Sequence, residues 1–367
     1  MAGAQRVCII GPSVDTNYIG GVATHIRNLK TFSCFRDAVV LDPGSVHSNS
    51  KVAFLQIIKN IASLRTTINV GDFTKILINS SIYPSAFIKL LMILATLPTN
   101  EQREIHVFFH GGRFPALNKV TGAIVNFFSR PFMAKVEKFH LLSRVQLEGF
   151  TRVFPKLQAG LYANYATSDS VWQKCRGVDT TTLRLLFVGR VVREKGVFEL
   201  FAAFEKILRD SRQISLTIAG DGPDLAELKK LNERLPPGAV QFLGFVTGDI
   251  LKAAYQNADV LLLPSYHEGF PYVVIEAMRA GLPIVSTSSG ALETLIQDGV
   301  TGFKVLPQDA DSIVNALGKL IEDRALLAEM SSNCQKYFQE NLSRSAAEKY
   351  YSQLLDCKGT DGLPGAL

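Results

Sequence analysis

The sequence lacks any run of about 18 uncharged apolar residues, the length that a membrane-spanning helix needs. Its most apolar stretch, residues 86–97, is shorter than that and contains Lys89. The first residues show no positively charged segment followed by a long apolar one, so we expect no secretory signal. Cysteines are also few: the five are scattered and never spaced as CxxC. This argues against a disulfide framework and a zinc site, and it fits reduced thiols in a cytoplasm.

Two signatures of other protein classes are missing. The first expected strand, residues 7–10, continues into Gly11-Pro12-Ser13-Val14 instead of a GxGxxG loop, which excludes a Rossmann dehydrogenase. No motif typical of DNA or RNA binding occurs. The Asp-x-Asp triplet at residues 309–311 precedes an apolar helical pattern. We therefore expect it to be the N-cap and first turn of a helix and not a metal site.

The chain is 367 residues long and 47% apolar, which predicts about two globular domains. Its charge is uneven. Residues 1–178 contain 20 Lys and Arg against 9 Asp and Glu, whereas the remainder contains 19 against 24, giving the net charge of +6. A basic half indicates an anionic partner. Nucleic acid, an anionic membrane surface and a phosphate-bearing acceptor are the candidates at this point.

Short apolar strands alternate with longer helical patterns throughout, which is typical of parallel α/β units. A polar stretch over residues 166–182 interrupts the alternation and is interpreted as a linker. We predict an α/β protein with two Rossmann-like domains facing a central cleft. The N-terminal domain covers residues 1–178 and the C-terminal domain covers 179–344. A C-terminal helix at about 345–356 is expected to return to the first domain.

The clearest candidate site lies in residues 267–276, where Glu268 and Glu276 flank a loop and the start of a helix. Such a loop can place one carboxylate at a ligand, and the free amides of the helix N-terminus can receive an anion. Taken alone, the same pattern fits a helix-capping residue followed by a solvated one.

Two further strand-end loops carry suitable residues. After an expected strand, Gly189 allows close approach of a ligand, and Arg190 with Lys195 can grip a diphosphate. An ordinary solvated loop is the alternative interpretation. The turn at residues 219–223, which contains Gly220, is of the kind that lines an α/β cleft, although a tight turn before a helix explains it equally well.

Taken in order, these segments resemble the retaining GT-B glycosyltransferases of glycosyltransferase family 4. Five motifs occur in register over about 105 residues: Gly189-Arg190 with Lys195-Gly196, Ala219 to Pro223, Pro264-Ser265 with Glu268 to Glu276, Gly281-Leu282-Pro283-Ile284-Val285, and Ser289-Gly290-Ala291-Leu292-Glu293. The first half is similar to the family through residues 20–25 and through His110-Gly111-Gly112.

The resemblance implies a role for each matching residue. Arg190 and Lys195 would neutralise the diphosphate of a nucleotide sugar, and Glu276 would bind the ribose. Glu268, with the amides of Gly269 and Phe270, would hold the donor sugar. The implied catalytic residues are Glu268, His110, Arg190 and Lys195. The implied substrate-binding residues are Gly20, Gly21, Gly189, Gly220, Gly269, Phe270, Pro271, Glu276 and Glu293, although Glu293 fits a helix cap equally well.

The resemblance also implies retention at the anomeric carbon, a UDP- or GDP-sugar donor, no metal and no cofactor, because cations replace a metal at the diphosphate. The segment Arg113–Lys138 mixes Phe127, Phe128, Phe132 and Met133 with basic residues, which fits contact with an anionic membrane. A core-facing stripe with snorkelling cations is the alternative.

We therefore expect a cytoplasmic glycosyltransferase, peripheral at the inner face of the cell membrane. Its acceptor would be a saccharide, expected to be lipid-linked, in the synthesis of envelope polysaccharide, O-antigen, capsule or lipopolysaccharide. We expect no nucleic-acid partner. Two alternatives stay open: a nucleotide-sugar 2-epimerase of the same fold and a non-catalytic subunit that binds a nucleotide sugar.

Overall fold

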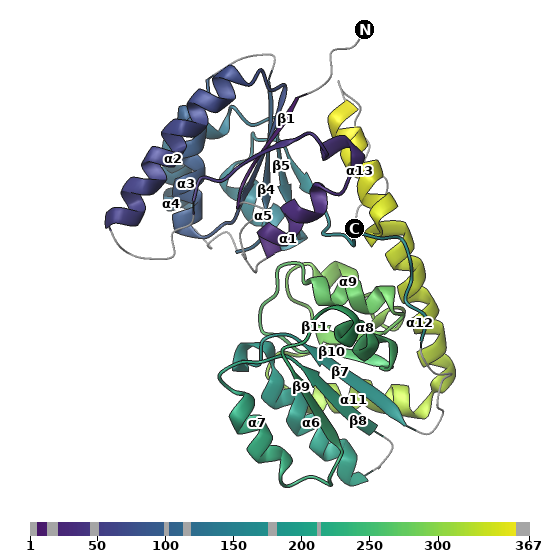
Figure 1. The fold of residues 1–367 in the computed structure, drawn as a ribbon. Helices are drawn as coiled ribbons and strands as arrows, with labels where there is room; N and C mark the ends of the chain where they lie inside the picture. The colour runs from purple at the N-terminus through teal and green to yellow at the C-terminus, as the bar shows by residue number, and fades with distance from the viewer. Residues whose placement is uncertain are drawn as a thin grey trace. The chain divides into compact units, whose positions relative to one another are not determined.

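The computed structural model describes residues 6–12, 21–44, 51–98, 103–112, 119–174, 182–210 and 214–356. Within these ranges the chain forms two compact α/β units (Figure 1). The described residues up to Thr167 and from Glu348 on make the first unit, and Ser168–Ala347 make the second. None of the described helices is both long and apolar enough to cross a bilayer.

The first unit is built on a parallel sheet of six strands in the order β2-β1-β3-β4-β5-β6. The strands are β1 (Val7–Ile10), β2 (Val39–Leu41), β3 (Lys75–Ser80), β4 (Glu104–Phe109), β5 (Lys138–Leu141) and β6 (Ala159–Leu161). The helices are α1 (Gly21–Leu29), α2 (Lys51–Val70), α3 (Pro84–Thr96), α4 (Lys119–Met133) and α5 (Arg144–Val153).

Helices cover both faces of this sheet, as buried apolar strands require. One face packs against α2, α3, α4 and α5 in a core to which Ile76, Ile78 and Phe109 contribute (Figure 1). The other face carries Phe108, whose ring lies 6.0 Å from that of His25 on α1. The C-terminal helix α13 (Arg344–Asp356) also packs here, because the Tyr350 hydroxyl lies 2.6 Å from His140 Nδ1.

The second unit repeats the design with a parallel sheet in the order β12-β11-β10-β7-β8-β9. Its strands are β7 (Leu183–Val188), β8 (Ile214–Ala219), β9 (Val240–Gly244), β10 (Val260–Leu263), β11 (Ile284–Thr287) and β12 (Gly302–Val305). Its helices are α6 (Val197–Asp210), α7 (Leu225–Asn232), α8 (Gly248–Gln256), α9 (Tyr272–Arg279), α10 (Leu292–Leu295), α11 (Ala310–Glu322) and α12 (Arg324–Tyr337).

The division between the units falls at residue 167, earlier than the expected boundary at 178. The reason is that residues 168–174, which were interpreted as part of a linker, pack on α9. Trp172 donates its backbone N–H to the carbonyl of Arg279, and its ring lies under the Arg279 guanidinium at 4.6 Å. A polar composition therefore hid a segment that is anchored to the second unit.

Candidate functional site at the carboxyl edge of the second sheet

The predicted residues of the second unit lie on loops at one edge of its sheet. In the strand order, β8 neighbours β7 on one side and β10 neighbours it on the other. Such a switch point, beyond the carboxyl ends of parallel strands, is where α/β sheets bind ligands. The loop after β7 carries Gly189 to Lys195, and the loop after β10 carries Glu268 to Pro271. Topology therefore places both predicted segments at the switch.

An ion pair joins these two loops. Lys195 Nζ lies 2.6 Å from Glu268 Oε1, and the two side chains are 29% and 8% exposed. Lys195 ends a short 3₁₀ turn, and the next residue, Gly196, has a φ of 68°. A Cβ on Gly196 would clash with the carbonyl oxygen of Pro264 in the second loop. Close packing of the two backbones thus brings a cation and a carboxylate together at the sheet edge.

The loop after β11 holds Glu268 from the other side. Ser289 Oγ accepts a 2.7 Å hydrogen bond from the backbone N–H of Glu268, and the N–H of Ala291 donates to the carbonyl of Gly269 at 2.8 Å. Gly290 has a φ of 62°, and a Cβ there would clash with the Glu268 carbonyl oxygen. Phe270 is buried, and Pro271 is the N-cap of α9. Two sequence motifs therefore form one framework.

The loops after β7 and β8 also pack with their backbones in close contact. The N–H of Gly189 donates to the carbonyl of Ala219 at 3.1 Å, and a Cβ on Gly220 would overlap the carbonyl oxygen of Gly189. Arg190 follows with an exposed side chain that makes no ion pair with any described residue. A second cation therefore stands at the edge without an internal counter-ion.

Glu276 is not a solvated residue. Its Oε2 accepts a 2.8 Å hydrogen bond from the hydroxyl of Tyr255, a fully buried residue of α8. Burial raises the pKa of Glu276, an effect that the Tyr255 hydrogen bond and the charge of Arg279 oppose. Tyr255 could not be identified from the sequence, because no local sequence motif marks a tyrosine that contacts Glu276 only through the packing of α8 on α9.

Two acidic residues elsewhere have simpler surroundings. Glu293 is exposed on α10, and the N-cap of that helix is Ala291, so Glu293 does not act as the cap. Asp309 caps α11, as predicted, by accepting from the backbone amides of Asp311 and Ser312. In the described ranges no three His, Cys, Asp or Glu side chains gather as metal ligands would.

In the first unit, His110 follows β4 and has both ring nitrogens engaged. Nε2 lies 2.7 Å from Asn79 Oδ1, and Nδ1 lies 2.9 Å from the Tyr162 hydroxyl. The amide oxygen of Asn79 can only accept, so His110 donates from Nε2 and accepts at Nδ1. Burial lowers the pKa of His110 to about 3. The ring is therefore neutral near pH 7 and has no free proton to transfer.

The other first-unit candidates are Gly20 and Gly21. Gly20 lies outside the described residues, and Gly21 is the first residue of α1. His25, on the same helix, is buried with its ring 4.4 Å from that of His110. The motif at residues 20–25 and the one at 110–112 are therefore neighbours within this unit.

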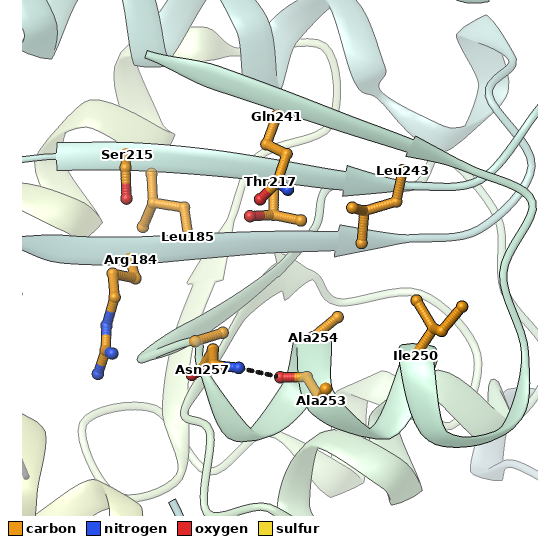
Figure 2. A pocket seen from close by; sticks show the side chains of 11 residues that line it. Arg184, Leu185, Ser215, Thr217, Gln241, Leu243, Ile250, Ala253, Ala254 and Asn257 are labelled. Carbon is orange, nitrogen blue, oxygen red and sulfur yellow. Dashed lines mark hydrogen bonds between the residues drawn. The ribbon is translucent and has the colours of Figure 1, made fainter. Parts of the chain in front are cut away.

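A separate pocket of about 350 Å³ lies on the second unit between β7, β8, β9 and α8 (Figure 2). Thr217 and Gln241, which are cross-strand partners, point into it, and Arg184 at one end is held by Asp259 at 2.8 Å. None of the sequence-predicted site residues lines this pocket. The chemistry-bearing side chains stand instead on the loops at the carboxyl edge.

Related sequences match mainly the second half of the chain. Residues 170–337 match the family model described as "Glycosyl transferases group 1". An uncharacterised glycosyltransferase of Methanocaldococcus jannaschii is 36% identical over 180 residues. That alignment covers 47% of this chain and 46% of the relative, so the chain spans less than half the length of the curated protein that it matches.

Solved structures match over nearly the whole chain. HepE of Anabaena, solved with UDP, has a TM-score of 0.74 at 16% identity and covers 96% of this chain and 99% of its own. The lipopolysaccharide outer core galactosyltransferase WaaB has a TM-score of 0.72 at 17% identity, with coverages of 96% and 99%. The likeness confirms the predicted GT-B fold.

Proposed function

We propose that the chain is a retaining glycosyltransferase that moves a sugar from a nucleoside-diphosphate sugar to an acceptor. The observation that carries the proposal is the Lys195–Glu268 pair at the strand switch, in the unit that matches group 1 glycosyl transferases. The Anabaena neighbour, solved with UDP and with UDP-glucose, supports a UDP-sugar donor, with a GDP-sugar as the alternative.

The donor would lie along the carboxyl edge of the second sheet. Arg190 and Lys195 would offset the charge that grows on the leaving diphosphate, so that no metal is needed there. Gly220 packs too closely on the Gly189 carbonyl to carry a Cβ, and glycine at position 189 would let a phosphate approach the backbone closely. Glu276, with Oε2 fixed by Tyr255, would accept from the ribose hydroxyls through its other oxygen.

Glu268 would orient the donor sugar together with the amides of Gly269 and Phe270. In the transfer, the bond between the anomeric carbon and the diphosphate oxygen breaks, and a bond to the acceptor oxygen forms on the same face. The proton of the acceptor hydroxyl passes to the departing phosphate. His110 would not transfer a proton, because its ring is held neutral and both of its nitrogens are bonded to Asn79 and Tyr162.

The acceptor would be a lipid-linked saccharide in cell-envelope polysaccharide synthesis. This part of the proposal is supported by the excess of basic residues in the first half of the chain and by the fold likeness to a lipopolysaccharide galactosyltransferase. It places the enzyme in the cytoplasm, peripheral at the inner face of the cell membrane. It includes no nucleic-acid partner.

A donor panel tests this function. The purified chain would be incubated with UDP-, GDP-, TDP- and ADP-sugars in EDTA, with lipid extract of the source organism as acceptor pool, and nucleoside diphosphate release would be followed. Release from one donor that depends on the extract and disappears in Glu268→Ala is expected. Isomerised free donor would instead identify the 2-epimerase, and binding without turnover would identify the non-catalytic subunit.

A further inference from the structure

Three of the four helices on one face of the first sheet, α2, α3 and α4, contain no acidic residue, whereas α5 carries the exposed Glu148. Helices α2, α3 and α4 contact one another side by side (Figure 1). Their sequences hold no Asp or Glu, and the described side chains of Lys59, Arg65 and Arg130 are exposed. The described exposed charges on these three helices are therefore all positive, which favours an anionic partner.

Helix α4 has two apolar faces. Val125, Phe132 and Met133 pack on the core. Ile124, Phe127 and Phe128 point outward and are 51%, 75% and 70% exposed. The segment is therefore divided between core-facing and surface-facing residues.

The outward residues form one continuous stripe. Ile124, Phe127, Phe128 and the exposed Pro131 follow the i, i+3, i+4, i+7 spacing of a single helix face. The rings of Phe127 and Phe128 lie 5.4 Å apart, edge to face. On α3, Ile88 is 57% exposed and adds apolar surface to the same layer. Monomeric soluble proteins rarely expose contiguous apolar surface of this kind unless something binds to it.

Not every cation of this region is available to a partner. Lys135, which follows α4, donates to the carbonyls of Leu94 and Leu97 at 2.9 and 2.7 Å. Lys89 donates to the carbonyl of Gly44 at 3.0 Å. Among the side chains of α2–α4 whose exposure the structure describes, the exposed cations are Lys59 and Arg65 on α2 and Arg130 beside the apolar stripe.

An apolar stripe with exposed cations beside it favours one kind of partner. A second copy of this face would bring cations against cations, because a two-fold interface pairs a patch with itself. Nucleic acid needs cations at the centre of its contact, whereas here the centre is apolar. A helix with Phe and Ile on its outer face and flanking cations fits the interface of an anionic bilayer, where rings enter the acyl boundary and cations meet the headgroups.

We infer that the α2–α4 layer docks on anionic membrane, with Ile124, Phe127 and Phe128 of α4 inserted and Lys59, Arg65 and Arg130 against the headgroups. This inference deepens the proposed function by specifying the surface that would bring the chain to a lipid-linked acceptor. It does not depend on turnover, so its failure and the failure of the transferase proposal are distinguishable.

Vesicle flotation tests the inference. The full chain would be mixed with vesicles of phosphatidylcholine alone or with 30% phosphatidylglycerol. Binding is expected only to the anionic vesicles, and F127S/F128S should weaken it at least about 10-fold. R65E/R130E should weaken it by a similar factor, since each cation near an anionic surface contributes roughly fivefold. High salt should reduce the contribution of the charges and leave that of the rings.

Matched controls lie on the second unit. Phe245 is 69% exposed, so Phe245→Ser tests the loss of an exposed aromatic elsewhere. R234E/K304E repeats the charge reversal at exposed positions. Both controls should bind as the unaltered chain does.

Equal binding by F127S/F128S, or no flotation of the unaltered chain with anionic vesicles, would overturn the inference. A dimer that dissociates in F127S/F128S would assign the surface to a second copy, and a complex with DNA that F127S/F128S abolishes would assign it to nucleic acid. Nucleoside diphosphate release with a soluble acceptor should be unchanged in F127S/F128S.

Discussion

Lys195 and Glu268 form an ion pair with 2.6 Å between Nζ and Oε1, although 73 positions separate them in the chain. The pair exists because β7 and β10 are neighbours in the sheet, so that the loops at their carboxyl ends meet. Glu268 is almost fully enclosed, whereas Lys195 retains access to solvent. A diphosphate arriving at the edge would therefore meet a cation whose position is already fixed.

Removing the positive charge of Lys195 should abolish most transferase activity. Lys195→Met is expected to lower kcat/KM at least about 100-fold, because one group that stabilises developing charge contributes that much or more. Lys206→Met is the matched control. Lys206 pairs with Asp311 on the same unit, but both side chains are largely exposed, and such pairs contribute little. Activity of Lys195→Met within threefold of the unaltered chain would contradict a role at the diphosphate.

Tyr255 should act on donor affinity through Glu276. In Tyr255→Phe the carboxylate loses the hydrogen bond to Oε2, and we expect KM for the donor to rise about 10-fold with little change in kcat, because a bond to a charged group contributes about 1.5–3 kcal/mol. Tyr337→Phe, which removes a buried hydroxyl with no described partner on α12, should leave KM unchanged. A fall in kcat alone would show that Glu276 does not serve in donor binding.

Alanine substitutions at Gly290 and Gly299 distinguish the effect of backbone strain from that of a steric clash at the site. Both have positive φ, 62° and 76°, but a Cβ on Gly290 would meet the Glu268 carbonyl, whereas one on Gly299 meets nothing within 4 Å. Gly299→Ala should cost about 1 kcal/mol of unfolding free energy and keep activity. Gly290→Ala should lose donor binding, measured by calorimetric titration with UDP. Equal UDP binding by both variants would show that the Glu268 loop need not hold its position.

Acidification should destabilise the protein through the first unit. Burial lowers the pKa of His106 to about 4 and that of His110 to about 3, and it holds His25 and His140 well below their usual range. The unfolded chain takes up protons on these groups below about pH 6.5 and the folded chain does not, so the unfolding free energy falls as the pH falls from about 6.5 to 4.

The expected slope is up to about 1.4 kcal/mol per pH unit for each such histidine. Urea unfolding at pH 7.5 and 5.5 measures it. His106→Gln should show a smaller loss between the two pH values, whatever its stability at pH 7.5. His267→Gln, at an exposed position of the second unit, should show the loss of the unaltered chain. An identical pH dependence of the two variants would contradict this explanation.

The sequence predicted what depends on local pattern. The strand Val7–Ile10 is a short apolar run and was predicted as such, as were the loops at Gly189 and Glu268. The edge strand Gly302–Val305, with four residues beside a turn, shows little sequence pattern. The anchor at Trp172 was missed because its partner lies on α9.

The partners of the site residues escaped for the same reason. Tyr255 and Asn79 each contact a site residue through tertiary packing, and neither belongs to a motif that the sequence displays. The opposite fates of Phe128 and Phe132, four positions apart on α4, likewise follow from where the sheet lies and not from composition.

The proposed function requires that the carboxyl edge of the second sheet bind a nucleoside diphosphate. Hydrogen–deuterium exchange with and without UDP tests it most directly, because it locates the ligand without requiring an acceptor. We expect protection in residues 189–196, 264–276 and 289–293, and none in residues 241–250, which border the pocket of Figure 2. Protection confined to residues 241–250, with none at Lys195 and Glu268, would show that the nucleoside diphosphate binds elsewhere.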